Sequence, residues 1–233
     1  MKRSATTLLA LLLTASSAHA ALRFPQVPVV GPSLQGYFNG IGESINVLTD
    51  QDNAQRWLST VSGNTSFTIQ LELTTNGAAN TVGLYNASDL APALYQVFPG
   101  AATTGWFAAA SFRSAPARVI VTLFDDNAVI QGQTTYLGAD ANDFGFYLQG
   151  PGGTFYTQDA RNPGGAAQAL AFKGTGGNAG NWWLAFDDVA VGTNNQIAAG
   201  SDQDYDDCVL FMESVNPTPV KNTTWGALKQ RFR

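Results

Sequence analysis

The feature that most constrains the fold is a repeated pattern of short apolar segments separated by turn residues. The segments are rich in β-branched and aromatic residues, and clusters of Gly, Asn, Asp and Ser separate them. Such a pattern is typical of strands joined by turns. The clearest examples are residues 66–73, 81–85, 118–124, 143–148, 168–172, 182–186 and 208–215. Many short strands at intervals of about 8 to 12 residues, without helices between them, predict an all-β antiparallel domain of the β-sandwich or jelly-roll type.

Residues 67–73 show the strictest alternation of apolar and polar side chains. Because successive side chains of a strand point to opposite faces, the apolar set is expected to face a core: Phe67, Ile69, Leu71 and Leu73. The Gly- and Pro-rich segments 150–153 and 162–165 flank a short strand at 154–156, and we expect both to be hairpin links. Helical periodicity is scarce. Its best examples are residues 49–58, with Asp50 or Asp52 as the N-cap, and residues 224–231.

Residues 1–20 have the organisation of a secretory signal peptide. Lys2 and Arg3 precede a short apolar run at 8–13, and Ala18-His19-Ala20 provides the small-residue pattern of a cleavage site. That run is too short to span a membrane, which takes about 20 apolar residues, and no later segment is long and apolar enough. We therefore expect an exported protein, located outside the cell, on its surface or in the periplasm. Residues 21–33 then form an extended lead-in, 34–215 the β-sandwich domain, and 216–233 a linker and a basic tail.

Export restricts the chemistry that the mature chain can perform. His19 is the only histidine and leaves with the signal peptide, which excludes catalytic triads and zinc sites that need imidazole. Cys208 is the only cysteine, so it has no disulfide partner in the chain and is expected to be buried. The net charge of -5 and the pI of about 4.6 argue against nucleic-acid binding. Carboxylates remain as the candidate acid, base or metal-binding groups.

Charge is distributed unevenly along the chain. All 17 acidic residues lie between residues 21 and 220, whereas four of the 12 basic residues lie in the last thirteen positions. This basic tail also carries aromatic and apolar residues, a composition suited to docking on another surface. Its candidate docking residues are Trp225, Lys229, Arg231 and Arg233. Two interpretations are open: attachment to a component of the cell envelope, and a frayed or packed terminus.

Six of the acidic residues are concentrated in two pieces near the C-terminus. They are Asp187, Asp188, Asp202, Asp204, Asp206 and Asp207. Crowded carboxylates repel one another unless a cation neutralises them, and calcium is bound by several oxygens at about 2.3 to 2.6 Å. The aspartates at 202, 204 and 206 alternate, so in an extended segment they would project to one side, and Asp187 or Asp188 would add an oxygen from a neighbouring strand end. The sequence thus predicts a candidate calcium site.

Two other interpretations of this segment have to be weighed. Residues 202–213 match the acidic positions of an EF-hand loop, but Asp207 occupies the sixth position, where that loop requires glycine. Moreover, residues 208–215 are predicted to be a strand, and no helices flank the loop. The remaining alternative is a solvated acidic turn, in which the aspartates make local hydrogen bonds to the backbone. The calcium site and the solvated turn both stay open.

The two acidic pieces resemble the bacterial domain-of-unknown-function family 4114. The resemblance rests on Ala185-Phe186-Asp187-Asp188, on Gly200-Ser201-Asp202 followed by Asp204-Tyr205-Asp206-Asp207, and on the preceding aromatic segments 144–148, 154–156 and 169–172. It covers about residues 120–215. Asp187 stands where the family often has Glu, and Asp206 where it usually has Asn, and both departures retain an oxygen ligand. The resemblance implies a secreted or surface β-domain of bacteria, without an established activity.

Trp182 and Trp183 are candidate sugar-stacking residues. Adjacent residues of a strand face opposite sides, so at most one of the two rings is expected to be exposed. The leading hypothesis is a non-enzymatic, exported protein of the bacterial surface or extracellular medium, with a calcium-stabilised acidic loop and a role in adhesion or surface assembly. The alternative is a carbohydrate-binding module or a glycosidase that uses two carboxylates.

Overall fold

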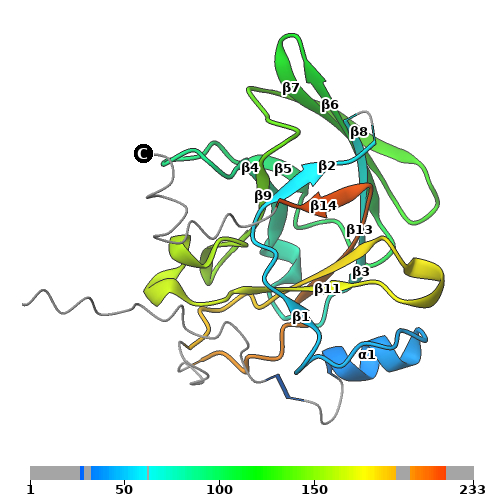
Figure 1. The fold of residues 1–233 in the computed structure, drawn as a ribbon, viewed down its shortest axis with the longest axis vertical. Helices are drawn as coiled ribbons and strands as arrows, with labels where there is room; N and C mark the ends of the chain where they lie inside the picture. Colours follow the sequence, from blue (N-terminus) through cyan, green and yellow to red (C-terminus); the bar gives the residue numbers. More distant parts are fainter. Residues whose placement is uncertain (1–26, 29–32, 62, 193–199, 219–233) are drawn as a thin grey trace, which may run out of the picture.

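The structure is a computed structural model, and it describes residues 27–28, 33–61, 63–192 and 200–218. Within these ranges the fold is mostly β and consists of two antiparallel sheets (Figure 1). This confirms the prediction of an all-β sandwich. The predicted signal peptide, most of the predicted lead-in and the basic tail lie outside the described residues.

The larger sheet has eight strands in the order β1-β11-β12-β13-β3-β6-β7-β8. Their bounds are β1 Gln51–Asp52, β11 Ala169–Lys173, β12 Trp182–Phe186, β13 Cys208–Glu213, β3 Asn64–Leu71, β6 Phe107–Ser114, β7 Ala117–Phe124 and β8 Ile130–Leu137. The smaller sheet has the order β14-β2-β9-β4-β5, and β10 pairs with β9. Its bounds are β14 Val215–Pro217, β2 Trp57–Ser59, β9 Phe144–Gly150, β4 Thr81–Asn86, β5 Tyr95–Phe98 and β10 Gly153–Tyr156.

The described residues contain one α-helix, α1 (Leu34–Gly40), which lies beside β11 in Figure 1. The hydroxyl of Ser33 caps it by accepting a hydrogen bond from Gly36 N at 3.2 Å. Four short 3-10 helices complete the elements: η1 Gly77–Ala79, η2 Asp159–Arg161, η3 Pro163–Gly165 and η4 Gly176–Asn178. The prediction of a helix at residues 49–58 is wrong, because β1 and β2 occupy this segment.

These elements pack around two large hydrophobic cores. The main core lies between the sheets and includes inward-facing residues of both, such as Phe67, Phe146 and Trp182. The second core lies on the outer face of β11, β12 and β13, where α1 contributes Leu34 and Phe38, both with no exposed surface. The three strands are therefore covered on both faces, and their near-continuous apolar sequences follow from that burial.

A bulge changes the predicted alternation in β3. Ile69 pairs with Leu210 and Leu71 pairs with Val209, so Gln70 is an extra residue on β3. Leu71 therefore packs against the second core instead of the main one, and Leu73, beyond the strand end, is 50% exposed. The prediction that Leu71 and Leu73 follow Phe67 and Ile69 into one core is wrong for this reason.

The two Gly- and Pro-rich segments have different roles. Residues 150–153 form the hairpin link between β9 and β10, as predicted, with Gly153 paired to Gly150. Residues 162–165 do not form a hairpin link, because the next strand, β11, belongs to the other sheet. There the side-chain amide of Asn162 accepts a hydrogen bond from Tyr156 N and donates one to Tyr156 O, both at 2.8 Å. These two bonds connect the segment to the end of β10.

Candidate metal centre

Two central strands carry the acidic residues to one end of the larger sheet. β12 ends at Phe186, β13 begins at Cys208, and these two residues pair directly. Asp187 and Asp188 follow the end of β12, while residues 202–207 precede the start of β13. Antiparallel pairing thus brings together two segments that are separated in sequence, as predicted from the chain alone.

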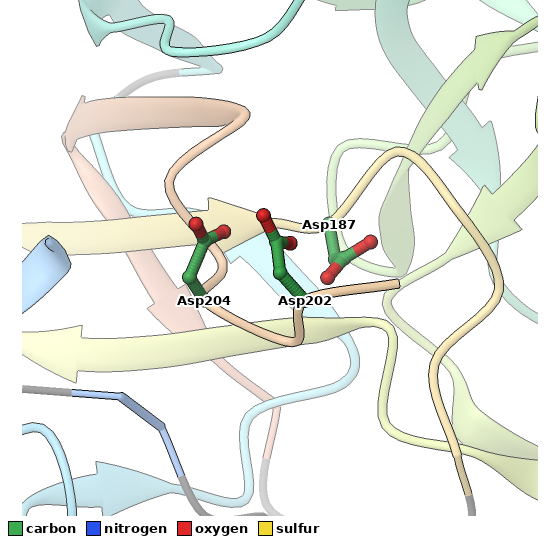
Figure 2. A group of neighbouring side chains, drawn as sticks. All are labelled: Asp187, Asp202 and Asp204. Carbon is green, nitrogen blue, oxygen red and sulfur yellow. The ribbon is translucent and has the colours of Figure 1, made fainter. Parts of the chain in front are cut away.

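Three carboxylates form a compact group at this end of the sheet. One oxygen each of Asp187, Asp202 and Asp204 lies within 4.8 Å of the others. Two oxygens bound to one calcium ion at 2.3 to 2.6 Å can be at most about 5 Å apart, so this spacing suits a shared cation. Asp187 is buried, Asp204 is half-buried and Asp202 is exposed. Figure 2 shows the side chain of Asp202 between the other two.

Hydrogen bonds hold the buried member of the group in place. Ser201 Oγ donates to Asp187 Oδ2 at 3.0 Å, and Val189 N donates to Asp187 Oδ1 at 3.0 Å. The same Ser201 hydroxyl accepts from Gln203 N at 3.0 Å, which connects the two acidic segments. Gln168 is fully buried, and its Nε2 donates to the carbonyls of Asp187 and Val189 at 2.8 and 2.6 Å. The Asp187 carboxylate therefore has a fixed orientation before any ion arrives.

The backbone before β13 is not extended, in contrast to the prediction. Gln203 and Tyr205 have φ values of 59° and 57°, in the left-handed region that residues with side chains rarely adopt. This geometry directs the ring of Tyr205 into the second core, where its hydroxyl donates to Ala167 O at 2.7 Å. Asp202 and Asp204 therefore lie on a turning, non-extended backbone near Asp187. Asp206 is not one of the group of three.

Asp206 is a separate and unusual member of the acidic segment. Its residue is 2% exposed, and its Oδ2 is a buried oxygen with no hydrogen-bond partner. A buried polar atom without a partner is costly and needs an explanation, of which a bound water or ion is one. Its surroundings are also acidic, because Asp204, Asp202 and Asp187 all act electrostatically on this carboxylate. This buried oxygen is a second observation in favour of a bound cation, and it lies next to the group of three, because the Asp206 carboxyl is a close neighbour of Asp204.

Burial and mutual repulsion raise the pKa values of these carboxylates. Burial is the main cause of the rise in the pKa of Asp187 to about 7, and Asp202 and Asp204 add repulsion. Burial likewise raises the pKa of Asp206 to about 7, with the charge of Asp204 next in importance. The pKa of Asp204 is also raised, by burial and then by repulsion from Asp202. Without a cation, the folded chain therefore holds protons on this cluster near neutral pH.

Asp188 and Asp207 belong to a neighbouring network. Asp188 Oδ2 accepts from Thr74 Oγ1 at 2.5 Å and from Asn80 Nδ2 at 2.7 Å, and its Oδ1 accepts from Asn76 Nδ2 at 3.3 Å. Asp207 Oδ2 accepts from Asp188 N at 2.8 Å. Burial raises the pKa of Asp207 to about 8, and Asp188 and Asp187 add repulsion. The Asp188 carboxylate already accepts hydrogen bonds from three side chains, so we place Asp188 beside the candidate metal site rather than in it.

The available ligands suit a hard cation. Among the basic residues that the structure describes, the ion pairs are Arg56 with Asp143 and Lys173 with Asp52, and no basic residue pairs with the acidic cluster. The donors at the cluster are oxygens only, which favours calcium or magnesium over zinc. Cys208 is 2% exposed, and burial raises the pKa of its thiol far above the ordinary value, so it is no competing ligand. The three aspartates can hold a metal ion.

Trp182 and Trp183 have structural positions. Trp182 is 5% exposed in the main core and contacts Trp57 edge-to-face, whereas Trp183 is 3% exposed in the second core. They face opposite sides, as the alternation predicts, but both sides are covered. Neither ring has a free face for a sugar in this structure, because α1 covers the side that would otherwise be open.

Several residues of the site could not be found from the sequence. Ser201 and Gln168 orient Asp187, and Thr74, Asn76 and Asn80 satisfy Asp188, but none belongs to a motif that indicates such a role. The predicted docking residues Trp225, Lys229, Arg231 and Arg233 lie outside the described residues. No helix in the described part of the chain is long and apolar enough to cross a membrane.

Comparison with known proteins identified no relative of this chain. The chain matches no protein-family model, no curated protein and no solved structure. The resemblance to family 4114 stays a prediction, and the function has to be argued from the site itself.

Proposed function

We propose that this chain is an exported, non-enzymatic β-sandwich protein of the bacterial surface or extracellular medium, and that its acidic cluster binds calcium as a structural ion. The observation that supports the calcium site most directly is the group formed by Asp187, Asp202 and Asp204, with one oxygen each within 4.8 Å. The buried, unpartnered oxygen of Asp206 beside it provides further support. Export is supported by the composition of residues 1–20.

A structural role for the ion follows from the position of the cluster. Asp187 extends from the end of β12, and Asp202 and Asp204 precede β13, so one ion would connect the ends of two paired central strands. A cation there would also remove the repulsion among carboxylates that have no basic partner among the described residues. Outside the cell, calcium sites with affinities of about 10⁻⁴ to 10⁻³ M are filled. The expected consequence is a chain that is more stable in the calcium-rich medium than in chelator.

Thermal unfolding of residues 21–233 in calcium and in chelator tests this proposal. A ligand at 100 times its Kd adds about 2.7 kcal/mol to the free energy of unfolding, which for a chain of this size raises the unfolding midpoint by about 5 to 10 °C. Asp204→Asn should abolish the rise. Asp126→Asn is the matched control, because Asp126 is an exposed aspartate of a distant turn. It should leave the rise unchanged.

Direct binding and ion selectivity complete the experiment. Isothermal titration calorimetry should detect one class of calcium site in the natural chain and none in Asp204→Asn, with magnesium binding more weakly because it prefers a smaller octahedral site. Absence of both heat and thermal shift at about 10 mM calcium, above the range of extracellular sites, would contradict the proposal. The acidic segment would then be the solvated turn.

Carbohydrate binding is the second candidate, and a different part of the molecule favours it. A cavity of about 520 Å³ is lined by the β6–β7 hairpin and by the segment after β8, and its polar lining includes Arg113, Asp140 and Asn142. Cavities of this size are typical of small-molecule sites. Retention on a polysaccharide column that Arg113→Ala removes, and that Asp204→Asn leaves intact, would favour this function over the first.

A further inference from the structure

Among the residues that the structure describes, no strand pairs with the outer edge of β8 (Ile130–Leu137), the last strand of the larger sheet. The sheet order ends at β8, and this strand lies in the upper part of Figure 1 with β6 and β7. All of its residues except Tyr136 are exposed, and the two at its ends, Ile130 and Leu137, are 62% and 69% exposed. An edge of this length presents a row of backbone N–H and C=O groups that another strand can pair with.

The sequence of β8 lacks the charged residues and prolines that often protect such an edge, and its one irregularity is the bulge at Gln131. Natural proteins block exposed edges with charged residues, especially Lys, with Pro, or with very short strands. β8 has eight residues, Ile-Gln-Gly-Gln-Thr-Thr-Tyr-Leu, and none of them is charged or a proline. The chain carries a net charge of -5, so a neutral edge of this length is a place where two copies can approach without like charges facing each other within the strand.

The hydrogen bonds to β7 show which backbone groups are free. Gly138 N donates to Ala117 O at 2.7 Å, and this pair continues the register in which Leu137 lies opposite Arg118. The hydrogen-bonding direction alternates along an antiparallel strand. The backbone groups of Leu137 therefore point to the free edge, and so do those of Thr135 and Gln133. The alternation ends at Gly132, because Gln131 is an extra residue of β8 at a bulge.

The inner face of β8 carries an uncovered glycine. Gly132, Thr134 and Tyr136 line a groove of about 220 Å³ together with Val97 and Val121. A Cβ atom added to Gly132 would have no other atom within 4 Å. Gly132 is therefore an open position, next to the bulge at which β8 has one extra residue, Gln131, relative to β7.

Elsewhere the same molecule covers strand glycines with tyrosines. Gly83 lies opposite Tyr147, and Gly145 lies opposite Tyr85, on β4 and β9. The tyrosine rings lie directly over these glycines, because an added Cβ would be 2.7 Å from Tyr147 Cε1 in the first pair and 2.3 Å from Tyr85 Cζ in the second. Cross-strand pairs of this kind stabilise sheets.

We propose that β8 pairs antiparallel with β8 of a second copy of this chain, about a two-fold axis at Thr134. A two-fold axis perpendicular to the sheet keeps the same face of both strands together. In this register Gly132 lies opposite Tyr136 of the partner subunit, and the reverse pair forms on the other side of the axis. The edge is thus self-complementary: Tyr136 of each copy, which also contacts Tyr95 of its own chain at 5.5 Å between ring centroids, lies opposite the open glycine of the other.

The register also satisfies the free backbone groups. Gln133 faces Thr135 of the partner subunit, and Thr135 faces Gln133 of the partner subunit, and the backbone groups of both residues point outward. The pairing adds about four backbone hydrogen bonds and joins the two larger sheets into one. On the axis, the two Thr134 side chains form a threonine pair, which is favourable between strands.

The oligomeric state of residues 21–233 tests the pairing. Light scattering coupled to gel filtration should show a dimer that dissociates on dilution. Gln133→Pro should give a monomer with an almost unchanged unfolding midpoint, because the N–H that it removes points outward. Leu137→Lys should also give a monomer, whereas Leu90→Lys, at a fully exposed leucine in a distant loop, should remain dimeric. A monomer at all concentrations up to about 1 mM, far above the Kd of specific complexes, or a dimer that neither edge variant affects, would overturn the proposal.

Cysteine cross-linking tests the register. Residues on the axis meet their own copies, so Thr134→Cys should form an intersubunit disulfide under mild oxidation, and Gln133→Cys should not. The native Cys208 is 2% exposed and does not compete. Cross-linking at Gln133→Cys instead would move the axis by one residue, separate Gly132 from Tyr136 of the partner subunit and overturn this register. Ladders of higher oligomers would overturn the two-fold pairing and indicate a strand of another segment at this edge.

Discussion

Glu43 shows how one buried carboxylate can connect distant segments. It is 5% exposed, and it accepts hydrogen bonds from Thr175 N, Thr175 Oγ1, Asn178 Nδ2 and Trp183 Nε1 at 2.5 to 3.0 Å. Burial by itself would raise the pKa of Glu43, but these donors outweigh it, and the pKa lies below the ordinary value. The carboxylate thus attaches the segment after α1 to the segment around η4 and to Trp183.

We expect Glu43→Gln to lower the free energy of unfolding by about 2 kcal/mol, because a side-chain NH₂ replaces an acceptor that faces only donors. Urea unfolding measures this change. Glu213→Gln is the matched control, since the exposed Glu213 accepts one hydrogen bond, from Ser66 Oγ, which glutamine can also accept; its effect should stay below about 0.5 kcal/mol. Equal midpoints for the two variants would contradict the role of Glu43.

At the same scale, the sequence was sufficient to predict the acidic cluster but not to show which of its aspartates form the group of three. Asp187, Asp202 and Asp204 converge as a set, and the crowding of carboxylates in the sequence indicated this. The hydrogen bonds that Thr74 and Asn80 donate to Asp188 could not be predicted, because those two residues lie far from Asp188 in the sequence. The left-handed backbone at Tyr205 was also hidden, because no local rule favours it for tyrosine.

The glycine and tyrosine pairs on β4 and β9 are features of whole strands. An added Cβ at Gly83 would lie 2.2 Å from Tyr95 O, a backbone atom that cannot move aside. Gly83→Ala should therefore lower the free energy of unfolding by about 3 kcal/mol, near the upper end of overpacking effects. Gly132→Ala is the control, because its Cβ would meet no atom within 4 Å. Measured by urea unfolding of dilute protein, a Gly83→Ala effect as small as that of Gly132→Ala would contradict this description of the sheet.

Strands were predicted better than helices, and the physical reason is clear. Residues 182–186 are predicted and observed as β12 with the same bounds, because a Gly- and Asn-rich segment precedes the strand and Asp187-Asp188 follows it. The N-terminal helix was missed, because it is only seven residues long and prolines precede it. Its stability depends on burying Leu34 and Phe38 against β11 and β12, a tertiary contact that local propensity does not report.

For the whole molecule, the raised pKa values predict a pH dependence with a definite sign. Without calcium, Asp187, Asp206 and Asp207 have pKa values of about 7, 7 and 8 in the folded chain, against about 4 when unfolded. Between these values the folded chain binds more protons, so the free energy of unfolding decreases as the pH rises. In chelator, the unfolding midpoint should fall between about pH 5.5 and pH 8.5.

Calcium should reverse this slope, because calcium and protons compete for the same oxygens. Calorimetry across that pH range, with calcium and with chelator, measures both slopes. The variant Asp204→Asn should keep a falling midpoint under both conditions. Parallel curves for the natural chain in calcium and chelator would contradict competition at this cluster.

The place of β13 in the larger sheet has a consequence for the order of events in synthesis. β13 (Cys208–Glu213) comes late in the chain, yet it lies in the middle of the sheet between β12 and β3. A growing chain therefore has two unconnected half-sheets until these last residues have been made, and pairing over such separations is slow. For the exported chain proposed above, the larger sheet can therefore be completed only after β13 has been made, shortly before β14. One late strand thus sets the moment at which folding can finish.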